Sequence, residues 1–126
     1  MGCLFDRGWY PGLMLQDQCA QLNLKARAIK GEVYAYEKEL EIQLDHIESI
    51  LPTPNGEYLK KYIELQLNGQ WLNALVYEIT PEFCKKMPLI DANDWVDWYA
   101  NKRAKSRNFI RCFLFCNTKF TFDSAL

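Results

Sequence analysis

One stretch of the chain repeats its apolar residues with the period of a helix. Between residues 37 and 51 these residues are spaced by four, three and four positions. Because an α-helix turns once every 3.6 residues, this spacing places them on one face and predicts an amphipathic helix over residues 37–51. The recurring residues are Leu40, Leu44, Ile47 and Leu51. Pro52 should then end the helix, because proline cannot continue the backbone hydrogen-bond ladder.

The next stretch alternates apolar and polar residues with the period of a strand. The apolar set is Leu59, Ile63, Leu65 and Leu67, and the polar set of opposite parity is Lys60, Glu64 and Gln66. Successive side chains of a strand point to opposite faces, so residues 58–67 are predicted to form a half-buried strand. Asn68 and Gly69 follow and favour the type I′ turn that joins antiparallel strands. Residues 70–79 are therefore predicted to form the second arm of a hairpin.

Less regular patterns predict further elements on both sides of this hairpin. Residues 25–36 are rich in β-branched and aromatic side chains and predict a strand. Glycine and proline interrupt residues 8–13, which predicts a shaped loop between the N-terminus and that strand. Thr80 and Pro81 form a helix start signal, so we predict a short helix that ends near Met87.

The C-terminal third of the chain is rich in aromatic residues. A second helix is predicted to start at residues 91–94, with three aromatic rings on one face and positive charge near its end, where it suits the helix dipole. The three aromatic residues are Trp95, Trp98 and Tyr99. Residues 108–122 are apolar and aromatic. They predict either a hairpin at the edge of a sheet or an exposed, adhesive segment.

Length and charge exclude several classes of partner. The chain has 126 residues, nearly half of them hydrophobic, which is enough for one core and predicts a single domain over residues 1–126. Its formal net charge is −1, so it lacks the basic surface that would neutralise a nucleic-acid backbone. The sequence has neither a membrane-spanning apolar run nor a secretory signal, and we expect a cytoplasmic protein that binds no membrane.

The five cysteines are interpreted as free thiols. They are Cys3, Cys19, Cys84, Cys112 and Cys116. An odd number of cysteines in a chain without an export signal argues against a disulfide framework. The spacing does not provide the four closely paired ligands of a zinc site, so we expect no metal and interpret the cysteines as small buried hydrophobic residues.

Three short motifs follow one another in a distinctive order. They are Tyr-Pro-Gly-Leu at residues 10–13, Gly-Glu-Val-Tyr at residues 31–34 and Leu-Asp-His-Ile-Glu at residues 44–48. This order resembles the gamma-glutamylcyclotransferase-like family. The strand predicted from Tyr58 also fits, although family members often have an arginine in place of Lys60. With the strand at residues 74–77, the resemblance covers about residues 4–80.

The resemblance implies both a fold and a reaction. The fold would be α+β, a small mixed β-barrel with flanking helices, followed by a C-terminal extension over residues 108–126. The substrate would be a small γ-glutamyl amine or peptide, whose own α-amine attacks the γ-carbonyl and releases 5-oxoproline and a free amine. The reaction would need no cofactor.

Glu48 matches the acid–base residue of that family. An ammonium group cannot attack a carbonyl, so a carboxylate must first remove its proton and later protonate the leaving amine. On the predicted helix Glu48 lies at the edge of the buried stripe, where partial burial would raise its pKa. The alternative is an ordinary solvated glutamate. Asp45 and His46 are both expected on the surface, without a catalytic role.

The resemblance also implies which residues would shape the substrate pocket. They are Tyr10, Pro11, Gly12, Leu13 and Tyr58. Aromatic residues of a loop can equally be structural plugs, and both interpretations stay open for Tyr10 and for its neighbour Trp9.

The start of the chain departs from the family pattern. Family members normally begin with a strand that runs into Tyr-Gly-Ser-Leu, whose backbone N–H groups hold the glutamyl end of the substrate. The chain has no matching segment, and we expect the first strand and its loop to be missing. A sheet without that strand would expose backbone edges, which predicts a homo-oligomer. Two functions stay open, the enzyme and a non-catalytic relative that acts as a binding or interaction module.

Overall fold

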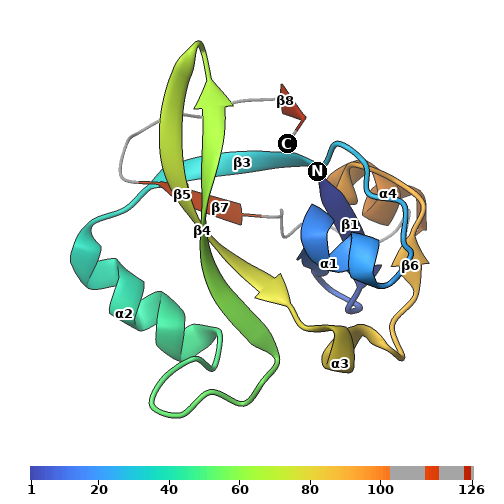
Figure 1. Ribbon diagram of the computed structural model, residues 1–126, viewed down its shortest axis with the longest axis horizontal. Helices are drawn as coiled ribbons and strands as arrows, with labels where there is room; N and C mark the ends of the chain where they lie inside the picture. Colours follow the sequence, from blue (N-terminus) through green and yellow to red (C-terminus); the bar gives the residue numbers. More distant parts are fainter. Residues whose placement is uncertain (103–112, 117–123, 126) are drawn as a thin grey trace.

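The computed structural model describes residues 1–102, 113–116 and 124–125 of the chain. It contains two β-sheets, one with the strand order β2-β1-β6 and the other with the order β4-β5-β7-β3-β8. Figure 1 shows α1 and α4 beside the first sheet, and α2 on the other side of the long β4–β5 hairpin. The predicted α+β class is confirmed. The two sheets are separate, so a closed barrel stays a prediction.

The first sheet begins with an N-terminal hairpin. Strand β1 (Gly2–Asp6) pairs antiparallel with β2 (Pro11–Leu15), and β6 (Leu89–Ile90) adds to the other edge of β1. The prediction of a loop over residues 8–13 was therefore wrong for residues 11–13, which lie in β2. The strand was missed because the apolar residues of β1 and β2 are buried on both faces of the sheet. A strand buried on both faces lacks the alternation of apolar and polar residues that marks a half-buried strand.

The second sheet is built around the predicted hairpin. Strands β4 (Tyr58–Leu67) and β5 (Gln70–Ile79) pair antiparallel along their whole length, with the predicted bounds. Asn68 and Gly69 have φ angles of 50° and 78°, as the predicted type I′ turn requires. One apolar residue of β4 departs from the predicted pattern: Leu59 is 44 % exposed, and Tyr58 is buried instead. Side chains of α2 cover the opposite face of β4 there, through contacts to Lys60.

The interior of the second sheet is completed from the C-terminal part of the chain. Strand β7 (Phe113–Cys116) lies between β5 and β3 (Lys30–Ala35), parallel to β3 and antiparallel to β5. Strand β8 (Ser124–Ala125) pairs with the other edge of β3. Because β7 pairs with both β5 and β3, the predicted position at the edge of a sheet is wrong for residues 113–116. The remainder of residues 108–122, including the predicted second arm of the hairpin, lies outside the described residues.

The structure changes two expectations, the bounds of the strand predicted over residues 25–36 and the open edges predicted for the sheet. The predicted strand over residues 25–36 is confirmed only for Lys30–Ala35, since residues 25–29 contribute a single bridge between Arg27 and Gly2. Strand β7 also occupies an interior position of the sheet, so β3 and β5 do not face each other as open edges. The predicted homo-oligomer rested on such edges and stays a prediction.

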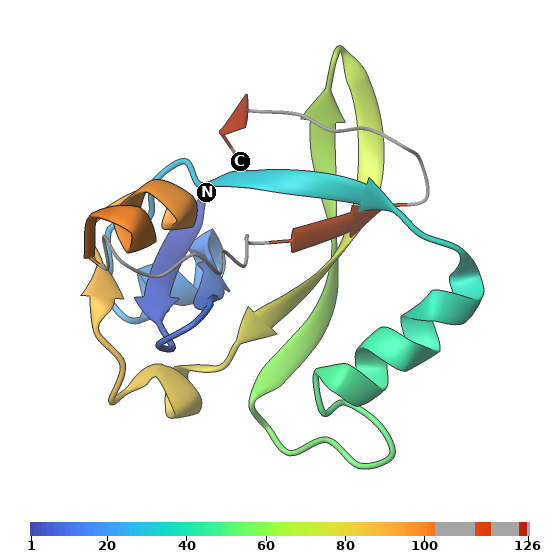
Figure 2. The same ribbon diagram turned by 180° about the vertical axis from the view of Figure 1, so that it is seen from behind.

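Four helices connect the strands of the described residues, as the two opposite views show (Figures 1 and 2). They are α1 (Gln16–Gln21), α2 (Lys38–Ile47), α3 (Pro81–Cys84) and α4 (Trp95–Lys102). Helix α3 begins after Thr80, as predicted. Helix α4 begins after Asp94, whose carboxylate accepts a hydrogen bond from the N–H of Val96 at 2.9 Å. The rings of Trp98 and Tyr99 lie 5.4 Å and 5.1 Å from that of the buried Trp95, which confirms the predicted aromatic face.

Helix α2 is shorter than predicted and buries a different face. It ends at Ile47 because Ser49 adopts a φ of 56°, a left-handed conformation that turns the chain out of the helix. Ile47 is 72 % exposed, whereas Asp45 is only 7 % exposed. The expectation that Asp45 lies on the surface was wrong. Its carboxylate binds the side chains of Lys60 and Tyr77, so the polar partners of the sheet decide which face of the helix is buried.

Buried side chains join the two sheets into one core. Strand β2 packs on β5 so closely that a Cβ on Gly12 would lie 2.8 Å from Cδ1 of Ile79. Cys3, Cys19 and Cys84 are buried free thiols, as predicted for these three cysteines; the other two fall outside the described side chains. None of the helices in the described residues is long and apolar enough to cross a membrane.

Candidate functional site

The turn between β1 and β2 positions Arg7 and Tyr10. Gly8 adopts a φ of 98°, which favours glycine, and its N–H donates to Oδ1 of Asp6 at 2.7 Å. The N–H of Arg7 donates to the carbonyl of Tyr10 at 3.2 Å and closes the turn. The side chain of Lys102 in α4 also forms an ion pair with Asp6. These contacts fix the point at which the Arg7 side chain leaves the backbone.

The segment between α2 and β4 positions Glu48 and Glu57. Glu48 is the C-cap residue of α2, and its N–H donates to the carbonyl of Leu44 at 2.8 Å. The backbone of Glu57 is held by Asn55, whose Oδ1 accepts from its N–H at 2.9 Å, and by Thr80, whose N–H donates to its carbonyl at 3.0 Å. Both carboxylates therefore sit on defined backbone positions.

Arg7 brings these two segments together. Its side chain is 15 % exposed and forms an ion pair with Glu57 through Nη1. The same nitrogen donates to the hydroxyl of Tyr58 at 3.0 Å. The guanidinium carbon also lies 5.3 Å from the ring centre of Tyr10 and 5.5 Å from that of Tyr58, within the range of a cation–π interaction. The turn after β1 and the start of β4 thus form one cationic and aromatic cluster.

The charges of this cluster act on Glu48. Burial raises the pKa of Glu48, and the nearby carboxylate of Glu57 raises it further, while the positive charge of Arg7 opposes the shift. Burial also raises the pKa of Tyr58, although Arg7 again acts in the opposite direction. Glu48 is therefore a half-buried carboxyl group that holds a proton more readily than an ordinary glutamate, next to a fixed cation.

A second polar network attaches α2 to the sheet close to Glu48. Asp45 accepts hydrogen bonds from Lys60 at 2.8 Å and from the hydroxyl of Tyr77 at 2.6 Å. Lys60 also forms an ion pair with Glu41 at 2.5 Å, one helical turn before Asp45, and lowers the pKa of Glu41. Burial and the Asp45 carboxylate raise the pKa of Tyr77, and the charge of Glu48 adds to this shift. The network fixes the end of α2 from which Glu48 projects.

The residues predicted to shape the pocket are divided between this cluster and the core. Tyr10 is half-buried beside Arg7, and Tyr58 is buried beside the same guanidinium. Pro11 is half-buried opposite Asp6, whereas Gly12 and Leu13 are buried in β2. The structure therefore brings Tyr10 and Tyr58 together around Arg7, whereas Gly12 packs against Ile79 and Leu13 belongs to a core cluster that does not include Tyr58.

Two neighbouring residues lie away from the cluster. Trp9 is 74 % exposed. His46 is exposed on α2, as predicted.

Comparison with known proteins shows the family to which the chain belongs. The family model described as gamma-glutamyl cyclotransferase, AIG2-like, matches residues 2–97 of this chain. The chain belongs to the AIG2-like gamma-glutamyl cyclotransferase family. It is similar to a curated protein of Halalkalibacterium halodurans named "Putative gamma-glutamylcyclotransferase", with 27 % identity over 104 residues that cover 82 % of this chain and 86 % of that protein. No solved structure was found to match the chain significantly.

The match extends further along this AIG2-like chain than the sequence motifs indicated. The motifs pointed to about residues 4–80, whereas the family model also includes β6 and the start of α4. Sequence reasoning missed Arg7 and Glu57 as members of the site. A sequence signal for Arg7 did exist, since it is a single cation in the turn directly before the Tyr-Pro-Gly-Leu motif, but its partners lie some fifty positions away along the chain.

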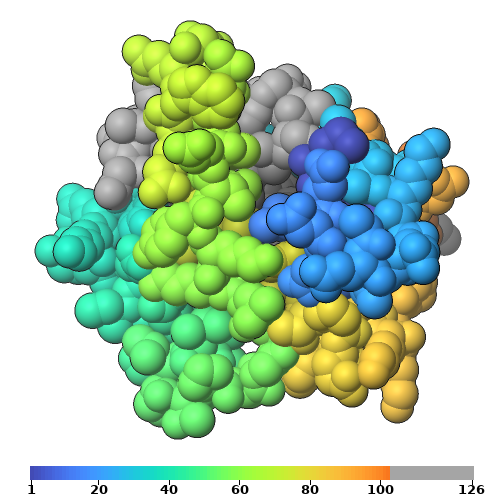
Figure 3. All heavy atoms as spheres, in the orientation of Figure 1, coloured from blue at the N-terminus to red at the C-terminus, as the bar shows by residue number. Residues whose placement is uncertain are grey.

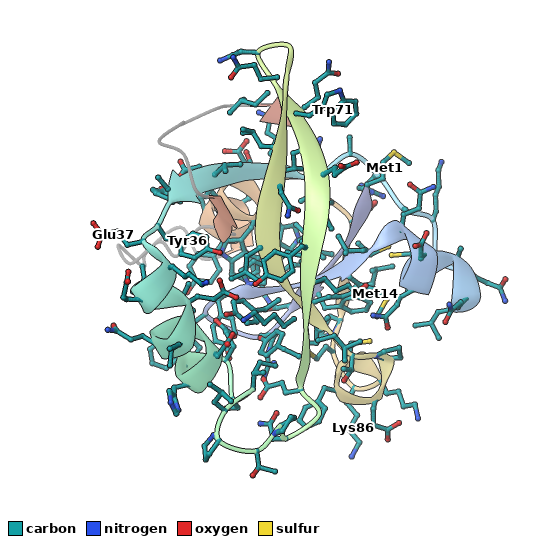
Figure 4. All side chains as sticks on the ribbon, turned by 60° about the vertical axis from the view of Figure 1, so that its left-hand side comes forward. Met1, Met14, Tyr36, Glu37, Trp71 and Lys86 are labelled. Atoms are coloured by element: carbon teal, nitrogen blue, oxygen red, sulfur yellow. The ribbon has the colours of Figure 1, made fainter. Side chains whose placement is uncertain are left out.

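A cavity of about 570 Å³ lies in a different part of this family member. Residues of β2, β4 and β5 line it, among them Leu13, Ile63, Leu65 and Trp71, together with Met1. Figure 4 shows Trp71 and Met1 on the same side of the molecule, and in Figure 3 the start of α1 borders β4 on the face turned to the reader. Glu48 and Tyr58 do not line this cavity. The arginine cluster, formed by Arg7, Tyr10, Glu48, Glu57 and Tyr58, is the better candidate for chemistry, because it contains Glu48 with its raised pKa.

Metal binding has no evident site in the part of the chain that the structure describes. That part contains no group of three or more histidine, cysteine, aspartate or glutamate side chains that could hold a metal ion.

Proposed function

We propose that this family member cleaves a γ-glutamyl amine into 5-oxoproline and a free amine, with Glu48 as the general acid and base. The observation that carries the proposal is the half-buried Glu48 carboxyl group, whose pKa is raised by burial and by Glu57, beside Arg7. A carboxyl group of raised pKa is suited to accept and return a proton near neutral pH. The family membership and the name of the similar curated protein support the same reaction.

The reaction proceeds through successive proton transfers on one carboxyl group. Ionised Glu48 removes a proton from the α-ammonium group, and the freed amine attacks the γ-carbonyl carbon, forming the new ring C–N bond. Protonated Glu48 then gives the proton to the leaving nitrogen as the original γ-amide C–N bond breaks. The ring nitrogen still carries one proton more than the lactam, and the regenerated Glu48 carboxylate removes this proton and passes it to the released amine, which leaves as an ammonium ion. Atoms balance without water, since the substrate divides into 5-oxoproline and the free amine.

The aromatic residues would position the substrate for this attack. Cyclisation requires the α-amine and the γ-carbonyl to approach within van der Waals distance, and holding a flexible chain in that geometry supplies much of the rate. We propose that the rings of Tyr10 and Tyr58 line the pocket, and that Pro11, Gly12 and Leu13 shape it from strand β2. The contacts of both rings with Arg7 support this arrangement.

The test measures release of 5-oxoproline from a panel of γ-glutamyl amines and peptides. Glu48→Gln keeps the size of the side chain and removes its proton chemistry, so kcat/KM should fall roughly 10²- to 10⁴-fold. Glu39→Gln is the matched control, since Glu39 is an exposed residue of the same helix, and it should leave turnover unchanged.

Each contrary result has a distinct meaning. Turnover that survives Glu48→Gln would assign the acid–base role to another group. If the wild-type chain releases no 5-oxoproline from any substrate, the protein is a non-catalytic relative that uses the fold for binding.

A further inference from the structure

Arg7 is a charged residue of the candidate site. The proposed reaction gives it no role in proton transfer. Its side chain is slightly more buried than that of Glu57, its ion-pair partner, with 15 % and 18 % exposed. Burial disfavours a guanidinium charge, but the hydroxyl of Tyr58 and the carboxylate of Glu57 compensate. Arginine is suited to bind planar anions, because its five N–H donors form a rigid fork.

The contacts of Arg7 leave part of that fork available. The ion pair with Glu57 and the hydrogen bond to Tyr58 both use Nη1. Among the residues that the structure describes, no side chain hydrogen-bonds Nη2 or Nε of Arg7. The rings of Tyr10 and Tyr58 lie near the guanidinium and limit how it can turn. Within the described part of the chain, the cluster therefore holds a fixed cation whose Nη2 and Nε donors are bound by no other side chain.

Because Arg7 lies next to Glu48, the anion that Arg7 would bind must lie close to the group that Glu48 deprotonates. In a γ-glutamyl group, the α-carboxylate and the α-amine are attached to the same carbon atom. A base that removes a proton from the α-amine therefore has the α-carboxylate within a few ångströms. Among the described residues, Arg7 is the cation whose charge acts on Glu48, since Lys60 pairs with Asp45 and Glu41.

We propose that Arg7 binds the α-carboxylate of the γ-glutamyl substrate and so selects substrates that carry it. This inference rests on the proposed cyclotransferase reaction. Glu57 holds the guanidinium through Nη1, and the substrate carboxylate takes the remaining donors as a charge-assisted pair. Tyr58 orients the same nitrogen from β4. Arg7 would thus be a specificity residue that this chain places in the turn before its Tyr-Pro-Gly-Leu motif.

The experiment compares two substrates on four proteins. The first substrate is the γ-glutamyl amine with the highest turnover, and the second is the same compound with its α-carboxylate converted to a neutral carboxamide. The proteins are the wild type, Arg7→Gln, Arg7→Lys and the control Arg27→Gln, which removes an exposed arginine paired with Asp91. The readout is kcat/KM for formation of the cyclic product, with KM and kcat separated.

The wild type should prefer the carboxylate substrate by roughly 10- to 100-fold, the effect of one hydrogen bond between charged groups. Arg7→Gln should lower kcat/KM for that substrate, mainly through KM, and leave the carboxamide nearly unchanged, so the preference disappears. Arg7→Lys should keep part of the preference, because it keeps the charge without the fork. Arg27→Gln should behave as the wild type.

A purely structural role of Arg7 predicts a different outcome. If Arg7→Gln reduces turnover of both substrates by the same factor, the inference is overturned while the proposed function stands. A wild type without turnover, or one insensitive to Glu48→Gln, would instead overturn the proposed function.

Arg7→Gln leaves Glu57 without its partner and could unfold the protein. The double variant Arg7→Gln with Glu57→Gln removes that unpaired carboxylate, and circular dichroism reports whether it is folded. Its substrate preference should also be lost, and a preference that survives in the folded double variant would overturn the inference.

Discussion

Replacing Lys61 by methionine should destabilise the protein by about 2 kcal/mol, because it leaves a buried carboxylate without its countercharge. Glu78 in β5 is fully buried, and its Oε2 forms an ion pair with Lys61 of β4. Its Oε1 accepts a hydrogen bond from the N–H of Leu15 at 2.8 Å. Glu78 therefore links the first sheet to the second, and Lys61 compensates its charge.

The magnitude follows from the exposure of the two partners. Removing one partner of a fully buried pair costs about 3–5 kcal/mol. The Lys61 side chain is 36 % exposed and that of Glu78 is 0 % exposed, so water already screens part of the pair. About half of the full cost is therefore expected, which corresponds to a shift of roughly 1 M in the urea midpoint.

The assay is urea unfolding at neutral pH, arranged as a double-mutant cycle. Glu78→Gln keeps the acceptor for the Leu15 N–H and removes the charge, so alone it should cost about 1 kcal/mol. Combined with Lys61→Met it should restore stability, because the uncompensated charge is gone. The control is Lys85→Met, which breaks an exposed pair with Glu82 and should change stability by less than about 0.5 kcal/mol. Additive effects of the two Lys61 and Glu78 substitutions would refute the argument.

Three further predictions concern packing and pH. Gly12→Ala should cost about 1–2 kcal/mol of stability, because the new Cβ meets Ile79, and Ile79→Val should relieve part of this cost in thermal unfolding of the double variant. Turnover should fall as pH decreases through the raised pKa of Glu48, and Arg7→Gln should move this limb to higher pH, since Arg7 opposes the shift. The raised folded-state pKa also means that ionisation of Glu48 disfavours folding, so Glu48→Gln should be the more stable protein at pH 7 and lose that advantage below about pH 4. Equal melting temperatures at both pH values would contradict this sign.

Local patterns predicted those elements whose burial alternates in a simple way. The β4–β5 hairpin has its predicted bounds because Asn68 and Gly69 favour one turn and the flanking strands expose one face. The aromatic face of α4 was predicted from residue spacing, because residues three and four positions apart lie on the same face of a helix. Strands β1 and β2 were not predicted, since both of their faces are buried and alternation is absent.

The candidate site could be predicted only in part. The motif pointed to Glu48, but the helix stripe used to place it was wrong, because α2 ends at Ile47 and that residue is 72 % exposed. The environment of Glu48 depends on Arg7 and Glu57, which lie far from it in sequence and meet through an ion pair between a turn and a strand start. The burial of Asp45 likewise depends on partners in β4 and β5 that helix periodicity does not contain.

The amino-acid sequence by itself determined the hairpin, the presence of the two longer helices and the family motifs, because these depend on backbone preferences and on side-chain periodicity between near neighbours. The buried face of α2 was not among them. The tertiary structure alone decided that β7 enters the sheet between β3 and β5, and that Arg7 lies beside Glu48 and Tyr58. Such arrangements depend on packing and charge complementarity between residues that are far apart in sequence. Local sequence patterns therefore do not predict them.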